Sequence, residues 1–167
     1  HRTAPIEMRD RVTVSTDRLE EALGALRSHT GNGVILSTCN RSEVYAQVAS
    51  TEDGVDAVLG FMRAYHGIDR QDLFPYLYMY NQEEAVSHLF RVACSLDSMI
   101  LGESQILGQV RRAFGVAGRH GMCNGGLSRL FNHALRVGKR ARTDTAIGRN
   151  ALSVSNAAVQ LARGVFP

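Results

Sequence analysis

The sequence lacks several features that would place the protein in a special class. No apolar run reaches the ~18–20 residues of a membrane span, so we expect neither a membrane segment nor a membrane partner. The three cysteines cannot form a closed disulfide framework, and this odd, low count is typical of a reducing cytoplasm. Neither a Cys-x-x-Cys nor a His-x-x-x-His pair occurs, so we expect no metal site.

Acidic residues are almost missing from the C-terminal third. The 167 residues are 44% hydrophobic and 21% charged, which is typical of a globular protein, and the net charge is only +3. Residues 1–110 nevertheless carry −6, whereas residues 111–167 carry +9 with Asp144 as their one acid. Such an asymmetry indicates a polyanionic partner for the basic part.

The first half has patterns of both helices and strands. Leucines at helical spacing after a possible N-cap at Thr16 predict a helix over 17–27. Two β-branched or alternating runs with a tight link predict an antiparallel pair of strands, and alternating aromatics predict a third strand, in which Pro75 indicates a start at the edge of a sheet. The predicted strands cover 33–39, 43–49 and 73–80, with a helix at 53–66.

The second half is helical throughout in its patterns. No proline occurs from Glu83 to Phe166, and glycine-rich breaks separate the periodic segments. The predicted helices cover 83–101, 103–119, 126–143 and 151–165. The predicted fold class is therefore α+β, with a small sheet subdomain followed by an α-helical bundle.

One cysteine has a position that suits a nucleophile. Cys39 ends a predicted strand and enters a tight turn, where its thiol can be exposed while the backbone is held. Arg41 lies two residues on and would favour the thiolate. The alternative is a small buried hydrophobic residue, which is the commoner role of a single cysteine.

The predicted helix at 83–101 carries two parallel stripes. One is apolar and predicts a core face, and a polar one beside it could line a cleft or face solvent. The apolar stripe is Leu89, Val92, Leu96 and Met99, and the polar stripe is His88, Arg91, Ser95 and Ser98.

The start of the next helix gathers short polar groups. Glu103, Gln105 and Gln109 surround it, and the two glutamines share a face. Such groups suit a ligand that has both an amine and a carboxyl group. Capping by Glu103 and two surface glutamines would explain the same residues.

Nine basic residues follow between 111 and 149, and Lys139 alone among them is a lysine. Arginine-rich helices can bind phosphates with two hydrogen bonds at a time. Because acids are nearly absent there, a nucleic-acid partner is favoured over a solvated helix face.

Four segments together resemble the glutamyl-tRNA reductase family. They are HRTAPIEMRDR at 1–11, STCNRSEVYA at 37–46, SLDSMILGESQILGQV at 95–110 and RARTDTAIGRNALSVSNAAV at 140–159. The resemblance covers the family's N-terminal catalytic domain nearly end to end. The family's first strand normally precedes this region, and its NADPH-binding and dimerisation domains normally follow. Since the chain begins at His1 without a methionine, we expect a piece of a longer protein.

The resemblance implies a reaction. The family reduces glutamyl-tRNA(Glu) to glutamate-1-semialdehyde through a cysteine thioester, the first step of 5-aminolevulinate and tetrapyrrole synthesis. The family's catalytic positions correspond to Cys39 and His88. Arg41 would pair the glutamate side-chain carboxylate, and Glu103 or the glutamines would hold the ammonium group. The positions that correspond to substrate contacts are Thr38, Asn40, Arg41, Ser98, Glu103, Ser104, Gln105 and Gln109.

The resemblance also implies partners. NADPH would be bound by a domain outside this chain, because no Gly-x-Gly-x-x-Gly occurs in it. Ser104 stands where many relatives have proline, which would loosen that helix start slightly. A homodimer and glutamate-1-semialdehyde aminomutase are expected partners of the full-length enzyme. Candidate tRNA contacts are Arg136, Lys139, Arg140 and Arg142.

The implied architecture is a βαβ-type sheet, like half of a ferredoxin-like fold, joined to a helical bundle. Residues 1–81 would carry the nucleophile, residues 82–150 would complete the substrate pocket, and residues 151–167 would begin the helix that leads to the NADPH-binding domain. Two other readings stay open, a truncated tRNA-binding module and a thiol esterase without reductase activity.

Overall fold

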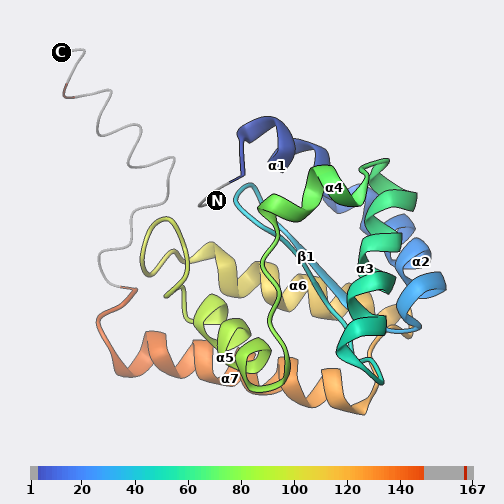
Figure 1. The fold of residues 1–167 in the computed structure, drawn as a ribbon. Coiled ribbons are helices and arrows are strands. Elements are labelled where there is room, and N and C mark those ends of the chain that lie inside the picture. Colours follow the sequence, from blue (N-terminus) through green and yellow to red (C-terminus); the bar gives the residue numbers. More distant parts are fainter. Residues whose placement is uncertain (1–3, 149–163, 165–167) are drawn as a thin grey trace.

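The computed structural model describes residues 4–148 and residue 164 (Figure 1). A β-hairpin lies between the helices of the first half and those of the second half. The elements are α1 (Ile6–Val12), the 3-10 turn η1 (Thr16–Arg18), α2 (Leu19–Thr30), β1 (Val34–Ser37), β2 (Ser42–Tyr45), α3 (Thr51–His66), α4 (Arg70–Leu73), the 3-10 turn η2 (Phe74–Tyr76), α5 (Gln82–Ala93), α6 (Gln105–Arg119) and α7 (Gly125–Asp144).

The hairpin confirms the predicted antiparallel pair. β1 pairs with β2, with Val34 opposite Tyr45 and Ser37 opposite Ser42, so both strands are shorter than predicted. β1 is buried along nearly its whole length because α2 and α6 both pack against it. A continuous apolar run is what such a strand requires.

The predicted helices at 17–27 and 53–66 are confirmed as α2 and α3, with a different start to the first. Arg18, rather than Thr16, is the N-cap residue of α2, and a 3-10 turn with Ser15 at its own N-cap precedes the helix. In α3 the Ser50 hydroxyl accepts a hydrogen bond from the Asp53 amide and so satisfies a free donor of the first turn.

The predicted third strand at 73–80 is wrong. Its beginning lies in α4 and η2, and the chain then runs extended from Leu77 without a ladder partner among residues 4–148. The alternating aromatics make side-chain contacts instead, since Tyr78 and Tyr80 pack against His88. The alternation of aromatic residues therefore indicated an extended backbone from Leu77 onward, but not a strand paired in a sheet.

Helix α5 ends well before the predicted boundary at 101. Ser95 adopts a left-handed backbone with φ of 59°, which stops the helix after Ala93. Leu89 and Val92 are buried as expected, but Leu96 and Met99 lie in the following loop and are exposed. The predicted apolar and polar stripes therefore end with the helix.

Helices α6 and α7 confirm the predictions for 103–119 and 126–143, and α6 starts two residues later than expected. The Asn124 side chain caps α7 by accepting from the Leu127 amide. The helix predicted at 151–165 lies outside the described residues.

One hydrophobic core joins the two halves. Its members come from α2, β1 and α3 as well as from α5, α6 and α7, and Phe61 and Phe131 are its largest fully buried side chains. The α+β class, with a small sheet followed by a helical bundle, is confirmed. The boundary at 81/82 stays a prediction, because the core is continuous across it. In the part that the structure describes, no helix is long and apolar enough to cross a bilayer.

Gly138 marks the closest approach of α7 to α5. A Cβ added there would lie 2.6 Å from the Ala93 carbonyl oxygen and 2.8 Å from the Leu107 Cδ1. We expect Gly138→Ala to lower the free energy of unfolding by about 1–3 kcal/mol through overpacking. In urea denaturation, the control Gly108→Ala, with open space around the new Cβ, should be neutral or stabilising. Equal effects of the two changes would contradict this packing account.

Candidate active site

Cys39 lies at the tip of the hairpin in a turn that holds its backbone firmly. The Thr38 amide donates to the Arg41 carbonyl at 2.8 Å. The Thr38 hydroxyl oxygen accepts from the amides of Asn40 and Arg41, both at 3.2 Å. Cys39 itself is exposed. The thiol is therefore presented to solvent from a fixed backbone, as a nucleophile requires.

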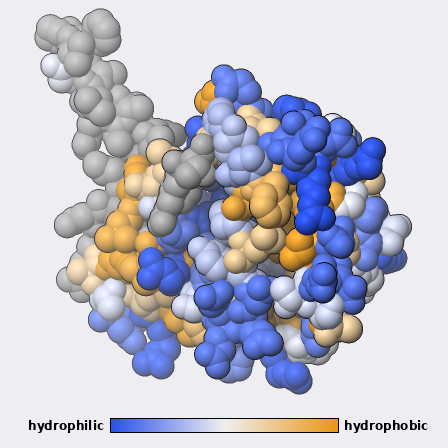
Figure 2. Space-filling model, in the orientation of Figure 1, coloured by the Kyte–Doolittle hydropathy of each residue, from blue (hydrophilic) through white to orange (hydrophobic). Residues whose placement is uncertain are grey.

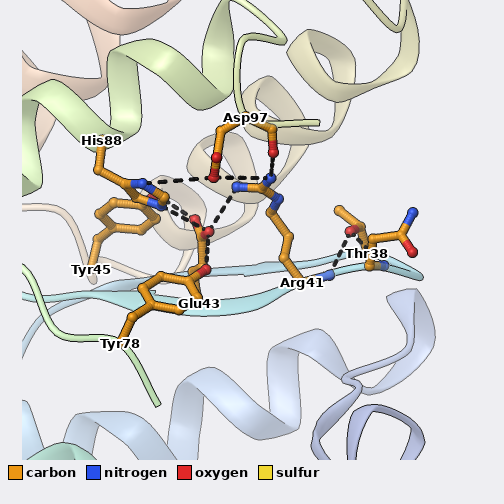
Figure 3. Close-up of polar contacts among 8 residues, drawn as sticks. Thr38, Arg41, Glu43, Tyr45, Tyr78, His88 and Asp97 are labelled. Atoms are coloured by element: carbon orange, nitrogen blue, oxygen red, sulfur yellow. Dashed lines mark hydrogen bonds and ion pairs between the residues drawn. The ribbon is translucent and has the colours of Figure 1, made fainter. Parts of the chain in front are cut away.

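A buried carboxylate lies just behind this turn (Figure 3). Glu43 Oε1 lies 2.9 Å from Arg41 Nη1 and 2.9 Å from His88 Nε2. The hydroxyls of Tyr45 and Tyr78 also donate to this carboxylate. Four side chains, from the hairpin turn, β2, α5 and the segment after η2, thus converge on Glu43.

These donors keep Glu43 ionised. Burial by itself raises the pKa of this carboxyl, but the hydrogen bond with His88, the charge of Arg41 and the two tyrosine hydroxyls outweigh it and lower the pKa to about 2. Burial and the negative charge of Glu43 raise the pKa of Tyr45 and of Tyr78, so both hydroxyls remain donors.

Arg41 connects the Glu43 cluster to the loop after α5. Its Nη2 donates to the Asp97 carbonyl and lies 3.6 Å from Asp97 Oδ2. Its side chain is only 4% exposed. The guanidinium therefore already has internal partners, and a ligand carboxylate would have to replace Asp97 to reach it.

The Glu43 carboxylate determines the hydrogen position on His88. An ionised carboxylate only accepts, so His88 Nε2 carries the hydrogen that Glu43 receives. The other ring nitrogen, Nδ1, lies 4.0 Å from Asp97 Oδ2. The imidazole also packs against the Tyr78 and Tyr80 rings, with centroids at 5.4 and 4.7 Å. His88 is thus held in one orientation from several sides.

A cavity of about 300 Å³ lies between β2, α3 and the extended segment after η2. Arg41, Glu43 and His88 form a polar part of its wall, and the rest is mostly apolar side chains of α1, α3 and the extended segment. Figure 2 shows apolar side chains gathered near the centre of this face, where that segment crosses the hairpin in Figure 1. Asn40 of the turn also lines the cavity.

The remaining predicted substrate residues lie in the loop between α5 and α6 and in the first turns of α6, where Gln105 and Gln109 are. Ser98, Glu103 and Gln109 are half-buried, and Ser104 and Gln105 are exposed. Ser104 occupies the N-cap position of α6, so Glu103 precedes the helix and does not open it. The Ser95 hydroxyl donates to the Glu103 carbonyl at 2.7 Å, which closes the loop at its neck.

The predicted tRNA contacts separate into two environments. Arg136, Lys139 and Arg140 are exposed on α7, and Arg140 pairs with Asp144. Arg142 instead donates internally to several groups of the α5–α6 loop and of its own helix. Of the predicted contacts, Arg136, Lys139 and Arg140 are therefore the exposed ones, and we refer to these three as the exposed basic face of α7.

Sequence reasoning found the turn, Arg41 and His88 but missed Glu43, Asp97 and Tyr78. One signal for Glu43 was present. It alternates in phase with Tyr45 in β2, and both residues face the core. An acid in phase with a core residue indicates a paired buried charge. No comparable signal marks Asp97, which reaches Arg41 only through the loop.

Of the three free cysteines, only Cys39 is exposed. Cys94 is buried and Cys123 is half-buried, and burial raises the pKa of both thiols. Both properties make them poorer nucleophiles. Among residues 4–148, no group of three or more His, Cys, Asp or Glu side chains is arranged to hold a metal ion.

Comparison with known proteins points to one class of enzyme. A family model described as "Glutamyl-tRNAGlu reductase, N-terminal domain" matches residues 1–145. The glutamyl-tRNA reductase of Carboxydothermus hydrogenoformans is 48% identical over 99% of this chain and 37% of its own length. That of Shewanella frigidimarina is 45% identical over 99% of this chain and 39% of its own length.

A solved structure agrees with these relatives. The glutamyl-tRNA reductase from Methanopyrus kandleri superposes with a TM-score of 0.74 at 35% identity, over 97% of this chain and 37% of that one. The chain belongs to the glutamyl-tRNA reductase family and corresponds to its N-terminal domain. It spans somewhat more than a third of the length of these relatives.

The Glu43 cluster should make stability depend on pH in the acidic range. The pKa of the Glu43 carboxyl in the folded protein is about 2, below the usual 4.5. The stabilisation that the ionised carboxylate gives to the folded state is therefore fully present above pH 4.5 and is lost as the pH falls towards 2. We expect Glu43→Gln to lower the free energy of unfolding at pH 7 by about 3 kcal/mol, because Arg41 loses a buried partner. Urea denaturation from pH 7 to pH 2 should show this difference shrinking.

The matched control is Glu21→Gln, which removes the carboxylate of the exposed pair with Arg18. It should leave the free energy of unfolding nearly unchanged. A difference between wild type and Glu43→Gln that stays constant down to pH 2 would contradict the ionised state assigned to Glu43.

Proposed function

We propose that this chain is the catalytic domain of a glutamyl-tRNA reductase and that it forms a glutamyl thioester on Cys39. The observation that carries the proposal is the exposed cysteine in a turn fixed by three hydrogen bonds, in a chain of this family. The complete enzyme would reduce glutamyl-tRNA(Glu) to glutamate-1-semialdehyde, the first step of tetrapyrrole biosynthesis by this route.

The step assigned to this chain is an acyl transfer. Cys39 reacts as the thiolate, and its Sγ forms a bond to the carbonyl carbon of the glutamyl ester. The bond between that carbon and the ribose oxygen breaks, and the oxygen takes up a proton from solvent as the tRNA leaves. The product is a thioester at an exposed turn, which leaves it accessible to a second domain.

Recognition of the glutamyl group is assigned to residues around the same turn and on the facing loop. Thr38 and Asn40 flank the nucleophile, and Ser98, Glu103 and Gln109 lie on or beyond the loop that Arg41 contacts through Asp97. A ligand carboxylate would displace the Asp97 carboxylate from Arg41, since that ion pair is 3.6 Å long, while the hydrogen bond from Arg41 to the Asp97 carbonyl would remain. Glu103 or the glutamines would hold the ammonium group. Gln105 and Ser104 at the start of α6 complete the set.

His88 is assigned a part in the reaction through its orientation. Glu43 holds Nε2, so Nδ1 is the ring nitrogen left for exchange of a proton with Asp97 or a ligand. Because Nε2 is bound to Glu43 and Nδ1 faces Asp97, His88 can either orient these carboxylates or transfer a proton through Nδ1.

The hydride step does not belong to this chain. The family depends on NADPH in general, but no Gly-x-Gly-x-x-Gly segment occurs here. NADPH would accordingly be bound by a different part of the full-length enzyme.

The exposed basic face of α7 is the proposed tRNA contact. Arg136, Lys139 and Arg140 lie on one side of a twenty-residue helix, where phosphates can reach them. We further expect a homodimer in the full-length enzyme, transfer of the product to glutamate-1-semialdehyde aminomutase, and a reducing cytoplasm as the location.

The nucleophile is tested by mass spectrometry after the chain is mixed with glutamyl-tRNA. We expect a glutamyl adduct on Cys39 that disappears in Cys39→Ser. Cys123→Ser is the matched control and should retain the adduct, because its thiol is half-buried. An undiminished glutamyl adduct on Cys39→Ser would refute the assignment. Steady release of free glutamate by the wild type would favour the thiol esterase.

The tRNA contact is tested by the salt dependence of binding. Arg136→Ala with Lys139→Ala should weaken tRNA binding and reduce the slope of log affinity against log salt by about 1.5, for two lost phosphate contacts. Filter binding between 50 and 200 mM salt measures both. The control Arg63→Ala on α3 should change neither. An unchanged slope in the double variant would place the tRNA surface elsewhere.

A further inference from the structure

Arg142 has a role that its place in a basic segment does not suggest. Its Nη1 donates to the Ala93 carbonyl at 2.9 Å and to the Gly138 carbonyl at 3.1 Å. Its Nη2 donates to the Ser95 hydroxyl at 2.8 Å and to the Glu103 carbonyl at 3.0 Å. One guanidinium thus binds the end of α5 and both ends of the loop that follows.

These acceptors form the neck of the 94–104 loop. Ala93 is the last residue of α5, whose carbonyl has no partner within the helix. Ser95 and Glu103 are already joined by the 2.7 Å bond between the Ser95 hydroxyl and the Glu103 carbonyl. The Gly102 amide adds a bond of 3.2 Å to the Ser95 carbonyl. The loop is therefore already closed by its own hydrogen bonds, and Arg142 adds further bonds to both of its ends.

The backbone at the neck needs such support. Ser95 is a fully buried residue with φ of 59°, a conformation that is strained for a residue other than glycine. A planar fork of donors satisfies the serine hydroxyl and two carbonyls together. A lysine ammonium at the same place is a single point with a different geometry.

The loop reaches the candidate active site through Asp97. The Asp97 carbonyl accepts from Arg41 Nη2, and Arg41 belongs to the turn that holds Cys39. The loop also carries Ser98 and ends at Glu103. Arg142 thus binds both ends of the loop and Arg41 binds Asp97 within it, so hydrogen bonds tie the loop to α7 on one side and to the hairpin tip on the other. Figure 3 shows the contact between Arg41 and Asp97.

We propose that Arg142 is a positioning residue that sets the 94–104 loop against the hairpin and so aligns the glutamyl group with Cys39. This proposal rests on the function proposed above. It assigns opposite roles to two parts of α7: the exposed face at Arg136 and Lys139 holds tRNA, and Arg142 holds the loop. Misplacement of the reacting groups by about 1 Å is enough to slow a reaction strongly.

The test separates the two roles by kinetics. Arg142→Lys keeps the positive charge but removes the fork. We expect the maximum rate constant of Cys39 acylation to fall about tenfold, with the half-saturating glutamyl-tRNA concentration unchanged within about twofold. Arg136→Ala with Lys139→Ala should do the reverse, raising the half-saturating concentration and leaving the maximum rate constant nearly unchanged.

Two further variants test whether the effect comes from the contacts of Arg142 with the loop. Ser95→Ala weakens the same neck from the loop side and should lower the maximum rate constant in the same direction by a smaller factor. Arg129→Lys, an exposed change on the same helix, should match wild type. A purely structural defect would reduce the amplitude of acylation, which reports the folded fraction, without changing the rate constant.

Hydrogen exchange provides a readout that does not depend on the reaction. In Arg142→Lys the Gly102 amide, which donates to the Ser95 carbonyl, should exchange faster, while the Leu36 amide of β1, which lies opposite Glu43, should not. Faster exchange at Gly102 with no acylation of the wild type would refute the proposed function and keep the loop assignment. Unchanged exchange at Gly102, or a raised half-saturating concentration with an unchanged maximum rate constant, would overturn the positioning role.

Discussion

The buried carboxylate of Glu43 is the interaction on which the rest of the site depends. It lies on β2, behind the turn that carries Cys39, and its negative charge needs donors because the side chain is buried. Arg41, His88 and two tyrosines supply them from three separate segments. The hairpin, α5 and the extended segment after η2 are therefore tied together at one point. The network also leaves Arg41 facing the loop, where it meets Asp97.

A second set of polar contacts holds the other side of the site. Arg142 joins the end of α5 to both ends of the 94–104 loop, and Gly138, one turn earlier, lets α7 approach α5 closely enough for this. The small residue and the arginine act together, because a larger residue at 138 would move the guanidinium away from its acceptors. Helix α7 thereby presents a basic surface on one side and holds an active-site loop on the other.

Sequence patterns predicted the elements whose periodicity matched their packing. In α7 the buried residues Leu127, Phe131, Ala134 and Gly138 repeat at helical spacing, and the helix was found nearly to its ends. The prediction failed where the helical spacing of apolar residues continued beyond the point at which the backbone leaves the helix. Leu96 and Met99 extend the apolar spacing of α5, but the left-handed Ser95 turns them out to solvent. Of the site, Cys39, Arg41 and His88 were identified from motifs. Glu43 and Asp97 were not, because acidic residues are usually exposed.

The sequence alone determined the chemical groups, the charge asymmetry between the two halves, and the local elements, since these follow from composition and short-range spacing. Only the tertiary structure decided which polar groups are buried and paired. Arg140 and Arg142 look equivalent in the sequence, yet one is exposed and the other closes a loop. Residues two apart on a helix point about 200° away from each other, so they face different surroundings. Which of them meets the loop depends on how α7 packs against α5, and that is set by contacts distant in the sequence.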